Sequence, residues 1–122
     1  MKKIEAIIRH ERLQAVQDAL DQLGVSGLTV SEVVGCGRQK GYTEQYRGTR
    51  ANISLLAKIK VESVVPSELV DSAVDAIVGA ARTGEIGDGR VFVYPIEQSI
   101  RIRTGESGED SVRHEEPVGW GH

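Results

Sequence analysis

The stretch LLAKIKVESVVPSELVDSAVDAIVGAA, residues 55–81, contains a strand and a helix separated by one proline. Apolar and polar residues alternate over 55–65, which indicates a strand with one buried face. The positions on that face are Ile59, Val61, Ser63 and Val65. Pro66 ends the strand, and Ser67 is placed to cap the helix that follows. The buried stripe of this helix is expected to be Val70, Ala73, Val74, Ile77, Ala80 and Ala81.

A second strand and helix precede this pair. Residues 2–9 alternate as a strand does, and residues 11–23 carry one apolar stripe that ends before Gly24, a common helix stop. Residues 28–34 are rich in β-branched side chains and predict another strand. The first part of the chain therefore has the order strand, helix, strand.

Two short strands are predicted after the second helix, at 91–94 and 99–103. The whole order is β-α-β, a long loop, β-α-β and a small extra strand. It is typical of an α+β fold, the ferredoxin-like double βαβ arrangement, with an antiparallel sheet and both helices on one face. The other face must be solvated or covered by neighbouring subunits. Apolar residues on both faces of 2–9 and 55–65 favour neighbouring subunits.

Composition limits the classes of function. The chain has 122 residues, the size of one domain, and 39% hydrophobic residues, enough for a modest core, so self-association is expected. A net charge of −3 argues against a general nucleic-acid binder. Cys36 is the only cysteine, which excludes an intrachain disulfide. No signal peptide or membrane-spanning run is recognised, so a cytoplasmic location is expected.

Residues 35–54 form a polar segment between two predicted strands, and a loop of this length is usually functional or disordered. Its first part, GCGRQKG, combines free backbone with positive charge, at Gly35, Gly37, Arg38, Lys40 and Gly41. Gln39 offers a neutral amide oxygen suited to Mg²⁺ already held by phosphates. Lys58, on the far side of the loop, is a candidate for binding a carboxylate. A mobile loop with solvated charges explains the same pattern.

The stretch GDGR and the later SIRIR give the strongest local signal for a ligand. Glycines at 84, 87 and 89 allow close backbone approach and N–H groups that point at an anion, with Arg90 next to them. In a strand, Arg101 and Arg103 share one face about 7 Å apart, with Ile100 and Ile102 facing inward. Guanidinium groups match phosphate oxygens, so a polyphosphate site is one interpretation. A solvated edge strand and an ordinary turn remain the other.

Other reactive residues favour no further site. The histidines His10, His114 and His122 are scattered, and Cys36 fits a buried or tolerated thiol better than a redox sensor. No nucleophile has a base and an orienting carboxylate beside it in the pattern. We therefore expect that the chain is not an enzyme. A small phosphate-handling enzyme on the same fold is the alternative, and it predicts phosphate release.

Four stretches together carry a family resemblance: MKKIEAII, GRQKGYTEQYRG, KIKVESVVP and RTGEIGDGRVFVYPIEQSIRIRTGE. They resemble the PII nitrogen-regulatory signal proteins from Met1 to about Glu106. The resemblance implies a homotrimer whose sites between subunits bind ATP or ADP. The nucleotide-binding residues it implies are Thr29, Gly35, Gly37, Arg38, Glu62, Val64, Gly87, Asp88, Gly89, Arg90, Arg101 and Arg103.

The resemblance also implies an effector and an output. With Mg²⁺ and ATP present, 2-oxoglutarate would chelate the metal beside Gln39. Its binding residues would be Gln39, Lys40, Gly41 and Lys58. Residues of about 37–55 would form the family's T-loop, whose population of conformations shifts with the ligand and which contacts target proteins. The residues expected to contact a partner are Tyr42, Tyr46, Arg47, Thr49 and Arg50.

Departures from the family pattern leave two functions open. Ala51 stands where many members have the uridylylated tyrosine, and Thr49 lies where some members are phosphorylated. Arg47 is retained, which favours an ammonium transporter, or another nitrogen-related transporter or enzyme, as partner; contact with a membrane would come only through a transporter. The leading hypothesis is a sensor of adenylate state and 2-oxoglutarate in nitrogen metabolism. The alternative is a divergent adenine-nucleotide sensor without the 2-oxoglutarate response, acting for example in inorganic carbon transport.

The expected domain organisation is one PII-type domain over residues 1–105 and a flexible carboxyl-terminal tail over 106–122. The tail is polar and rich in turn-forming residues, and no family counterpart suggests a role for it.

Overall fold

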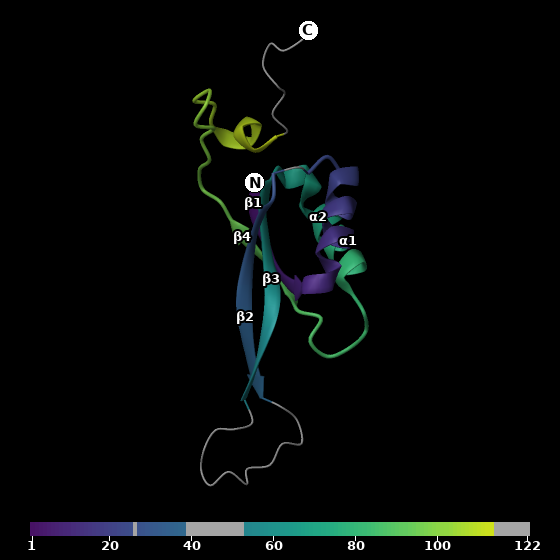
Figure 1. The fold of residues 1–122 in the computed structure, drawn as a ribbon. Coiled ribbons are helices and arrows are strands. Elements are labelled where there is room, and N and C mark those ends of the chain that lie inside the picture. The colour runs from purple at the N-terminus through teal and green to yellow at the C-terminus, as the bar shows by residue number, and fades with distance from the viewer. Residues whose placement is uncertain (26, 39–52, 114–122) are drawn as a thin grey trace, which may run out of the picture.

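The computed structural model describes residues 1–25, 27–38 and 53–113 (Figure 1). The strands are β1 (Lys2–Arg9), β2 (Thr29–Arg38), β3 (Ile53–Val65) and β4 (Arg90–Pro95). The helices are α1 (Leu13–Gln22) and α2 (Val70–Ala81), with short 3-10 helices η1 (His10–Arg12), η2 (Ser67–Leu69) and η3 (Gly108–Val112). The sheet is antiparallel with order β2-β3-β1-β4, and both helices lie on one face. The predicted ferredoxin-like fold is confirmed.

The core lies between that face of the sheet and the two helices. Alternate residues of β1 and β3 are buried, as the sequence pattern predicted: Ile4, Ala6, Ile8, Ile59, Val61, Ser63 and Val65. The helices add Val16, Leu20, Val70, Ala73, Ile77 and Ala81. Burial of a Val, Leu or Ile side chain contributes about 1.5–3 kcal/mol, so this interface supplies most of the stabilisation. Among the described residues, no helix is long and apolar enough to cross a membrane.

The β2–β3 hairpin is longer than the sequence predicted. Residues 35–38 and 53–54 were expected in the loop, yet the ladder pairs Thr29–Arg38 with Ile53–Glu62 without a break. Pairing between the two strands stabilises an extended backbone at these residues, although their own composition favours a loop. The predicted T-loop over about 37–55 therefore overlaps both strands at its ends, and residues 39–52 lie outside the described part of the chain.

The predicted serine cap of α2 is wrong. Ser67 lies inside η2, and α2 begins at Val70 without a side-chain cap. The Ser67 hydroxyl instead donates to Glu109 Oε2 at 2.7 Å and accepts from the Met1 amino group at 2.9 Å. A carboxylate distant in sequence competes for the hydroxyl that the local pattern assigned to the helix.

The predicted strand over 99–103 is also wrong. Only Ile100 pairs, in an isolated bridge with Ser107, and Ile100 and Ile102 are 55% and 99% exposed rather than facing inward. The Gly105 N–H donates to the Arg101 carbonyl at 2.7 Å, and the Arg101 N–H donates to the Glu106 carbonyl at 2.8 Å. This turn satisfies the backbone locally, whereas a strand needs a neighbour that the described chain does not provide here.

The sheet face opposite the helices carries both charged residues and, as the sequence predicted, apolar ones, with Ile7 on β1 and Val64 on β3. Lys3 Nζ lies 3.1 Å from Glu62 Oε2 and 3.7 Å from Glu5 Oε1, and it also lies over the Tyr94 ring. Large exposed apolar side chains on this face belong to Leu56, Phe92 and Tyr94. Coverage of this face by neighbouring subunits, and the homotrimer itself, stay predictions.

Candidate functional site

Residues 82–89, here called the glycine loop, connect α2 to β4 and are organised around one carboxylate. Asp88 Oδ2 accepts the N–H groups of Thr83 at 2.8 Å and Gly84 at 2.9 Å. Asp88 Oδ1 accepts the Thr83 hydroxyl at 2.5 Å and Arg9 Nε at 2.9 Å. The Thr83 hydroxyl and then the Arg9 guanidinium hold the pKa of Asp88 well below its usual range. The carboxylate is therefore ionised at neutral pH and fixes the shape of the loop.

Two glycines let the loop lie directly against the sheet. Gly89 has a φ of +100°, and a Cβ there would lie 1.7 Å from the Ile7 carbonyl oxygen of β1. Gly87 has a φ of +103°, and a Cβ there would lie 3.3 Å from the Arg9 guanidinium. No L side chain fits at Gly89 without moving β1, so this glycine is a steric requirement of the site.

Positive side chains surround the outer surface of the loop. Arg9 donates to the Ile86 carbonyl at 2.9 Å, Lys58 Nζ donates to the Gly87 carbonyl at 2.5 Å, and Arg90 follows in an exposed position. In the part of the chain that the structure describes, the N–H groups of Gly87 and Asp88 donate to no protein acceptor. Cations beside free backbone donors form a site that suits an anion such as a phosphate.

Arg9 is a site residue that sequence reasoning missed. It is the last residue of β1, paired with Lys58 across the sheet, and it reaches a carboxylate 79 positions away. The available signal was its place in the period-2 pattern: Lys3, Glu5, Ile7 and Arg9 share the face away from the core. An arginine at the end of the strand, on the face away from the core, can contact a loop packed beside that end, as Arg9 contacts the glycine loop.

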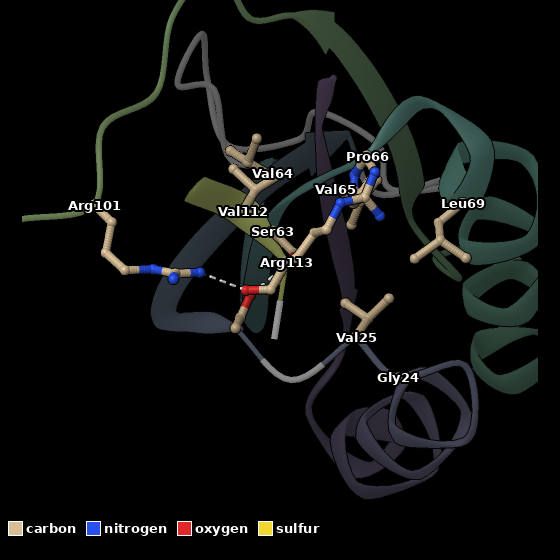
Figure 2. Close-up of a pocket in the computed structure, with 11 residues that line it drawn as sticks. Gly24, Val25, Ser63, Val64, Val65, Pro66, Leu69, Arg101, Val112 and Arg113 are labelled. Atoms are coloured by element: carbon tan, nitrogen blue, oxygen red, sulfur yellow. Dashed lines mark hydrogen bonds between the residues drawn. The ribbon is translucent and has the colours of Figure 1, made fainter. Parts of the chain in front are cut away.

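A second group of predicted residues lies toward the other end of the sheet. Thr29 pairs with Glu62 across β2 and β3, and the Glu62 carboxylate accepts Lys3 Nζ. Val64 and Arg101 line a cavity of ≈ 360 Å³ (Figure 2). The other residues that line it are Gly24, Val25, Gly27, Ser63, Val65, Pro66, Leu69, Val112 and Arg113. β2 starts only at Thr29, so the β3 edge beyond Glu62 has no β2 neighbour and borders this cavity.

The Arg101 side chain lines this cavity and is only 13% exposed. Its guanidinium contacts Glu106 Oε1 at 2.5 Å and donates to the carbonyls of Asp110 at 3.2 Å and Arg113 at 2.8 Å. The dashed line in Figure 2 marks the contact with Arg113. The segment predicted as a tail therefore has defined contacts as far as Arg113, including those of η3.

The two groups do not meet within one chain. Glu62 and Lys58 are four positions apart on β3 (62 − 58 = 4), which corresponds to about 13 Å along an extended strand. The glycine loop, Lys58 and Gly35 lie near one end of the sheet, whereas Thr29, Val64 and Arg101 lie near the other. Within one chain the two groups therefore lie at opposite ends of the sheet.

Several predicted residues cannot be placed. The effector residues Gln39, Lys40 and Gly41 and the partner-contact residues Tyr42, Tyr46, Arg47, Thr49 and Arg50 lie outside the described residues. Gly37 and Arg38 are placed by their backbone alone, at the end of β2 opposite Ser54 and Ile53. Cys36, which precedes them in β2, is exposed and pairs with Leu55 of β3.

Comparisons with known proteins agree on one family. The family model described as "Nitrogen regulatory protein P-II" matches residues 1–106. Proteins of that name from Rhodobacter capsulatus and Nostoc punctiforme are 59% and 57% identical over 112 residues, which is 92% of this chain and 100% of each relative. The crystal structure of Arabidopsis thaliana PII bound to citrate is similar with a TM-score of 0.76 and 39% identity, over 96% of this chain and 94% of that one.

Proposed function

Since the chain belongs to the P-II family of nitrogen regulatory proteins, which transduce signals in nitrogen regulation, we propose that it senses ATP, ADP and 2-oxoglutarate. Its output would be the regulation of target proteins through the segment between β2 and β3. The observation that carries this proposal is the glycine loop, which presents free N–H groups between Arg9, Lys58 and Arg90.

The glycine loop is the proposed phosphate end of the nucleotide site. Arg90 and the N–H groups of Gly87 and Asp88 would contact phosphate oxygens, with Gly35 and Arg38 of β2 alongside. The Asp88 carboxylate would take no part, because four donors already hold it inside the protein and its charge repels phosphate. Its role would be to shape the loop.

The cavity beside Val64 is the proposed nucleoside end. Thr29, Glu62 and Val64 would contact the nucleoside, and Arg101 and Arg103 would approach the phosphates from this side. Because the two ends are separated within one chain, each nucleotide would lie between two copies. This supports the homotrimer, since the site is incomplete without the neighbour's contribution.

The effector site is proposed next to the phosphate end. Lys58 reaches the glycine loop and could exchange the Gly87 carbonyl for the distal carboxylate of 2-oxoglutarate. Gln39, with Lys40 and Gly41, would hold the near end and, through its amide oxygen, Mg²⁺. When bound, that ion would neutralise phosphate charge and give the keto acid a cation to chelate.

The output is proposed to be a protein contact and not a reaction. Ligands at the base of the hairpin would bias the conformations of residues 39–52, which would present Tyr42, Tyr46, Arg47, Thr49 and Arg50 to a partner. An ammonium transporter, or another transporter or enzyme of nitrogen metabolism, is the proposed partner. A cytoplasmic location is proposed together with these ligands, and no catalytic step is proposed.

The experiment that tests the proposal is titration of 2-oxoglutarate into the purified protein in a calorimeter. Three runs would contain Mg²⁺ with ATP, ADP, or no nucleotide. Heat only in the run with Mg²⁺ and ATP is the expected result. Nucleotide binding without any 2-oxoglutarate heat would favour the divergent adenylate sensor, which the loss of tyrosine at Ala51 also supports. Absence of nucleotide binding would overturn both.

A further inference from the structure

We propose that residues 106–113, here called the carboxyl-terminal turn, compete with the nucleotide for Arg101 and that Arg113 holds the turn in the competing position. The inference rests on the proposed nucleotide site and adds a regulatory element to it. In this arrangement residues of the turn bind the arginine side chain that would otherwise bind a phosphate of the nucleotide.

The first observation is how completely the turn occupies Arg101. One guanidinium nitrogen contacts the Glu106 carboxylate at 2.5 Å, and the other donates to the carbonyls of Asp110 and Arg113 at 3.2 and 2.8 Å. These acceptors are the kind that a phosphate supplies, a charged oxygen with further oxygens beside it. A phosphate on this guanidinium would compete with the Glu106 carboxylate for the same donors and would be repelled by its charge.

The second observation is a set of contacts that fixes the turn to the body of the protein. Arg113 forms an ion pair with Glu68 of η2 at 2.7 Å and lies 3.6 Å from Glu109. Glu109 accepts the Met1 amino group at 3.1 Å and the Ser67 hydroxyl at 2.7 Å. The turn is therefore attached to η2 and to the amino terminus, in addition to Arg101.

The third observation is the place of the turn at the cavity. Val112 and Arg113 form part of the cavity wall, and in Figure 2 the Arg113 side chain extends toward Pro66. A movement of the turn would change the space available for a nucleoside and would release Arg101 at the same time. One rearrangement would thus open both parts of the proposed nucleoside end.

The consequence for affinity follows from the population of the open state. If only a fraction of molecules has the turn displaced, the observed Kd is the intrinsic Kd divided by that fraction. Weakening the contacts of Arg113 raises the fraction and should tighten nucleotide binding. The opposite role, Arg113 as a direct cation for the ligand, predicts weaker binding when its charge is removed, so the sign of the effect separates the two.

The test measures Kd for ATP and for ADP with full-length protein carrying Arg113→Gln, Glu68→Gln, or both. Each single variant should lower Kd by about two- to five-fold, the range for one exposed ion pair, and the double variant should do no more. Glu106→Gln should lower it further. Matched controls are Lys2→Gln and Asp71→Asn, exposed residues that form no ion pair within the described chain, and these should leave Kd unchanged.

Hydrogen exchange provides a readout that does not depend on the variants folding equally well. Saturating ATP should speed exchange at the N–H groups of Gly105 and Gly108, which donate to the carbonyls of Arg101 and Ser99. The Ala73 amide inside α2 serves as the internal control.

The outcomes are separable. Wild-type protein that binds no nucleotide would refute the proposed function together with this inference. Normal wild-type binding with unchanged Kd in every turn variant would refute only the inference. A higher Kd for Arg113→Gln alone would instead make Arg113 a ligand contact, and slower exchange at Gly105 and Gly108 with ATP would show that the nucleotide closes the turn.

Discussion

The glycine loop and the carboxyl-terminal turn are built from the same kind of contact but are attached to the fold differently. Each joins an arginine to a carboxylate, Arg9 to Asp88 at 2.9 Å and Arg101 to Glu106 at 2.5 Å. The loop is also pressed against the β1 backbone at Gly89, whereas the turn is attached to η2 through the ion pair between Arg113 and Glu68.

This difference separates a fixed site from a movable one. The close approach to β1 at Gly89 leaves the loop little room to shift, and Asp88 holds it through four hydrogen bonds. Ion pairs between exposed side chains contribute little, and the pair of Arg113 with Glu68 that attaches the turn to η2 is of this kind, so its loss should cost little. Rigid and adjustable ligand contacts can thus coexist in one small domain.

The largest effect is expected at the fixed site. Gly89→Ala places a Cβ 1.7 Å from the Ile7 carbonyl oxygen, so β1 or β4 must move, and stability should fall by about 3 kcal/mol or more. Urea unfolding measures this loss. Nucleotide binding should be lost as well, because the N–H groups of the loop would be displaced.

Gly84→Ala is the matched control for that variant. Gly84 also has a positive φ, +92°, but a Cβ there meets nothing within 4 Å. The strain of a left-handed alanine alone costs about 1–2 kcal/mol. If Gly89→Ala were no more destabilising than Gly84→Ala, the loop would not be fixed by its contact with β1, and the comparison drawn above would fail.

The next effect concerns the division of labour within the fixed site. Lys58→Ala should abolish 2-oxoglutarate binding, because it removes the cation proposed for the distal carboxylate. ATP and ADP binding should be spared, because Arg9 and Asp88 still hold the loop after the Lys58 contact with the Gly87 carbonyl is removed. Outside the fixed site, Arg103→Ala on the nucleoside side should weaken ATP and ADP alike. Calorimetry with each ligand distinguishes these outcomes, and equal loss of nucleotide and 2-oxoglutarate in Lys58→Ala would contradict the division.

The periodicity of the sequence predicted the parts of the fold that depend on residues close together in the chain. Alternation over 2–9 and 55–65 gave the buried faces of β1 and β3 correctly, since both strands pack one face on the helices. The failures involve distant partners. Residues 35–38 lie in β2 because β3 pairs with them, Ser67 contacts Glu109 at 42 positions' separation, and 99–103 alternate without a neighbouring strand.

The site follows the same division. Glycine and arginine in GDGR are chemically specific, so the loop was identified as an anion site from residue type alone. The contact between Arg9 and Asp88 spans 79 positions and is created by the register of β1 with β4, which no short motif encodes. The occupation of Arg101 by Glu106 was hidden by the expectation of a strand, which would have separated the two side chains.

The smallest effect, a pH dependence, sharpens the comparison between the two carboxylates. The Ser67 hydroxyl, followed by the Met1 amino group, lowers the pKa of Glu109 to about 2, and the pKa of Asp88 is also well below its usual range. A carboxyl whose pKa is lower in the folded state stabilises the fold fully above its unfolded pKa, about 4.3 for Glu, and loses this contribution as pH falls through the folded pKa. Urea midpoints between pH 7 and pH 2 should therefore show a gap between wild type and Glu109→Gln that shrinks on acidification.

The same titration of Asp88→Asn should show a larger gap at pH 7, because the Asp88 carboxylate organises a whole loop and is less exposed than that of Glu109, at 24% against 37%. Its decline should extend to lower pH, since more donors hold the charged form. A gap that widened toward acid for either variant would mean that the carboxylate destabilises the fold. Equal gaps at pH 7 would mean that the turn is attached to the fold as firmly as the loop. Displacing the turn from Arg101 would then cost as much free energy as displacing the loop from Asp88.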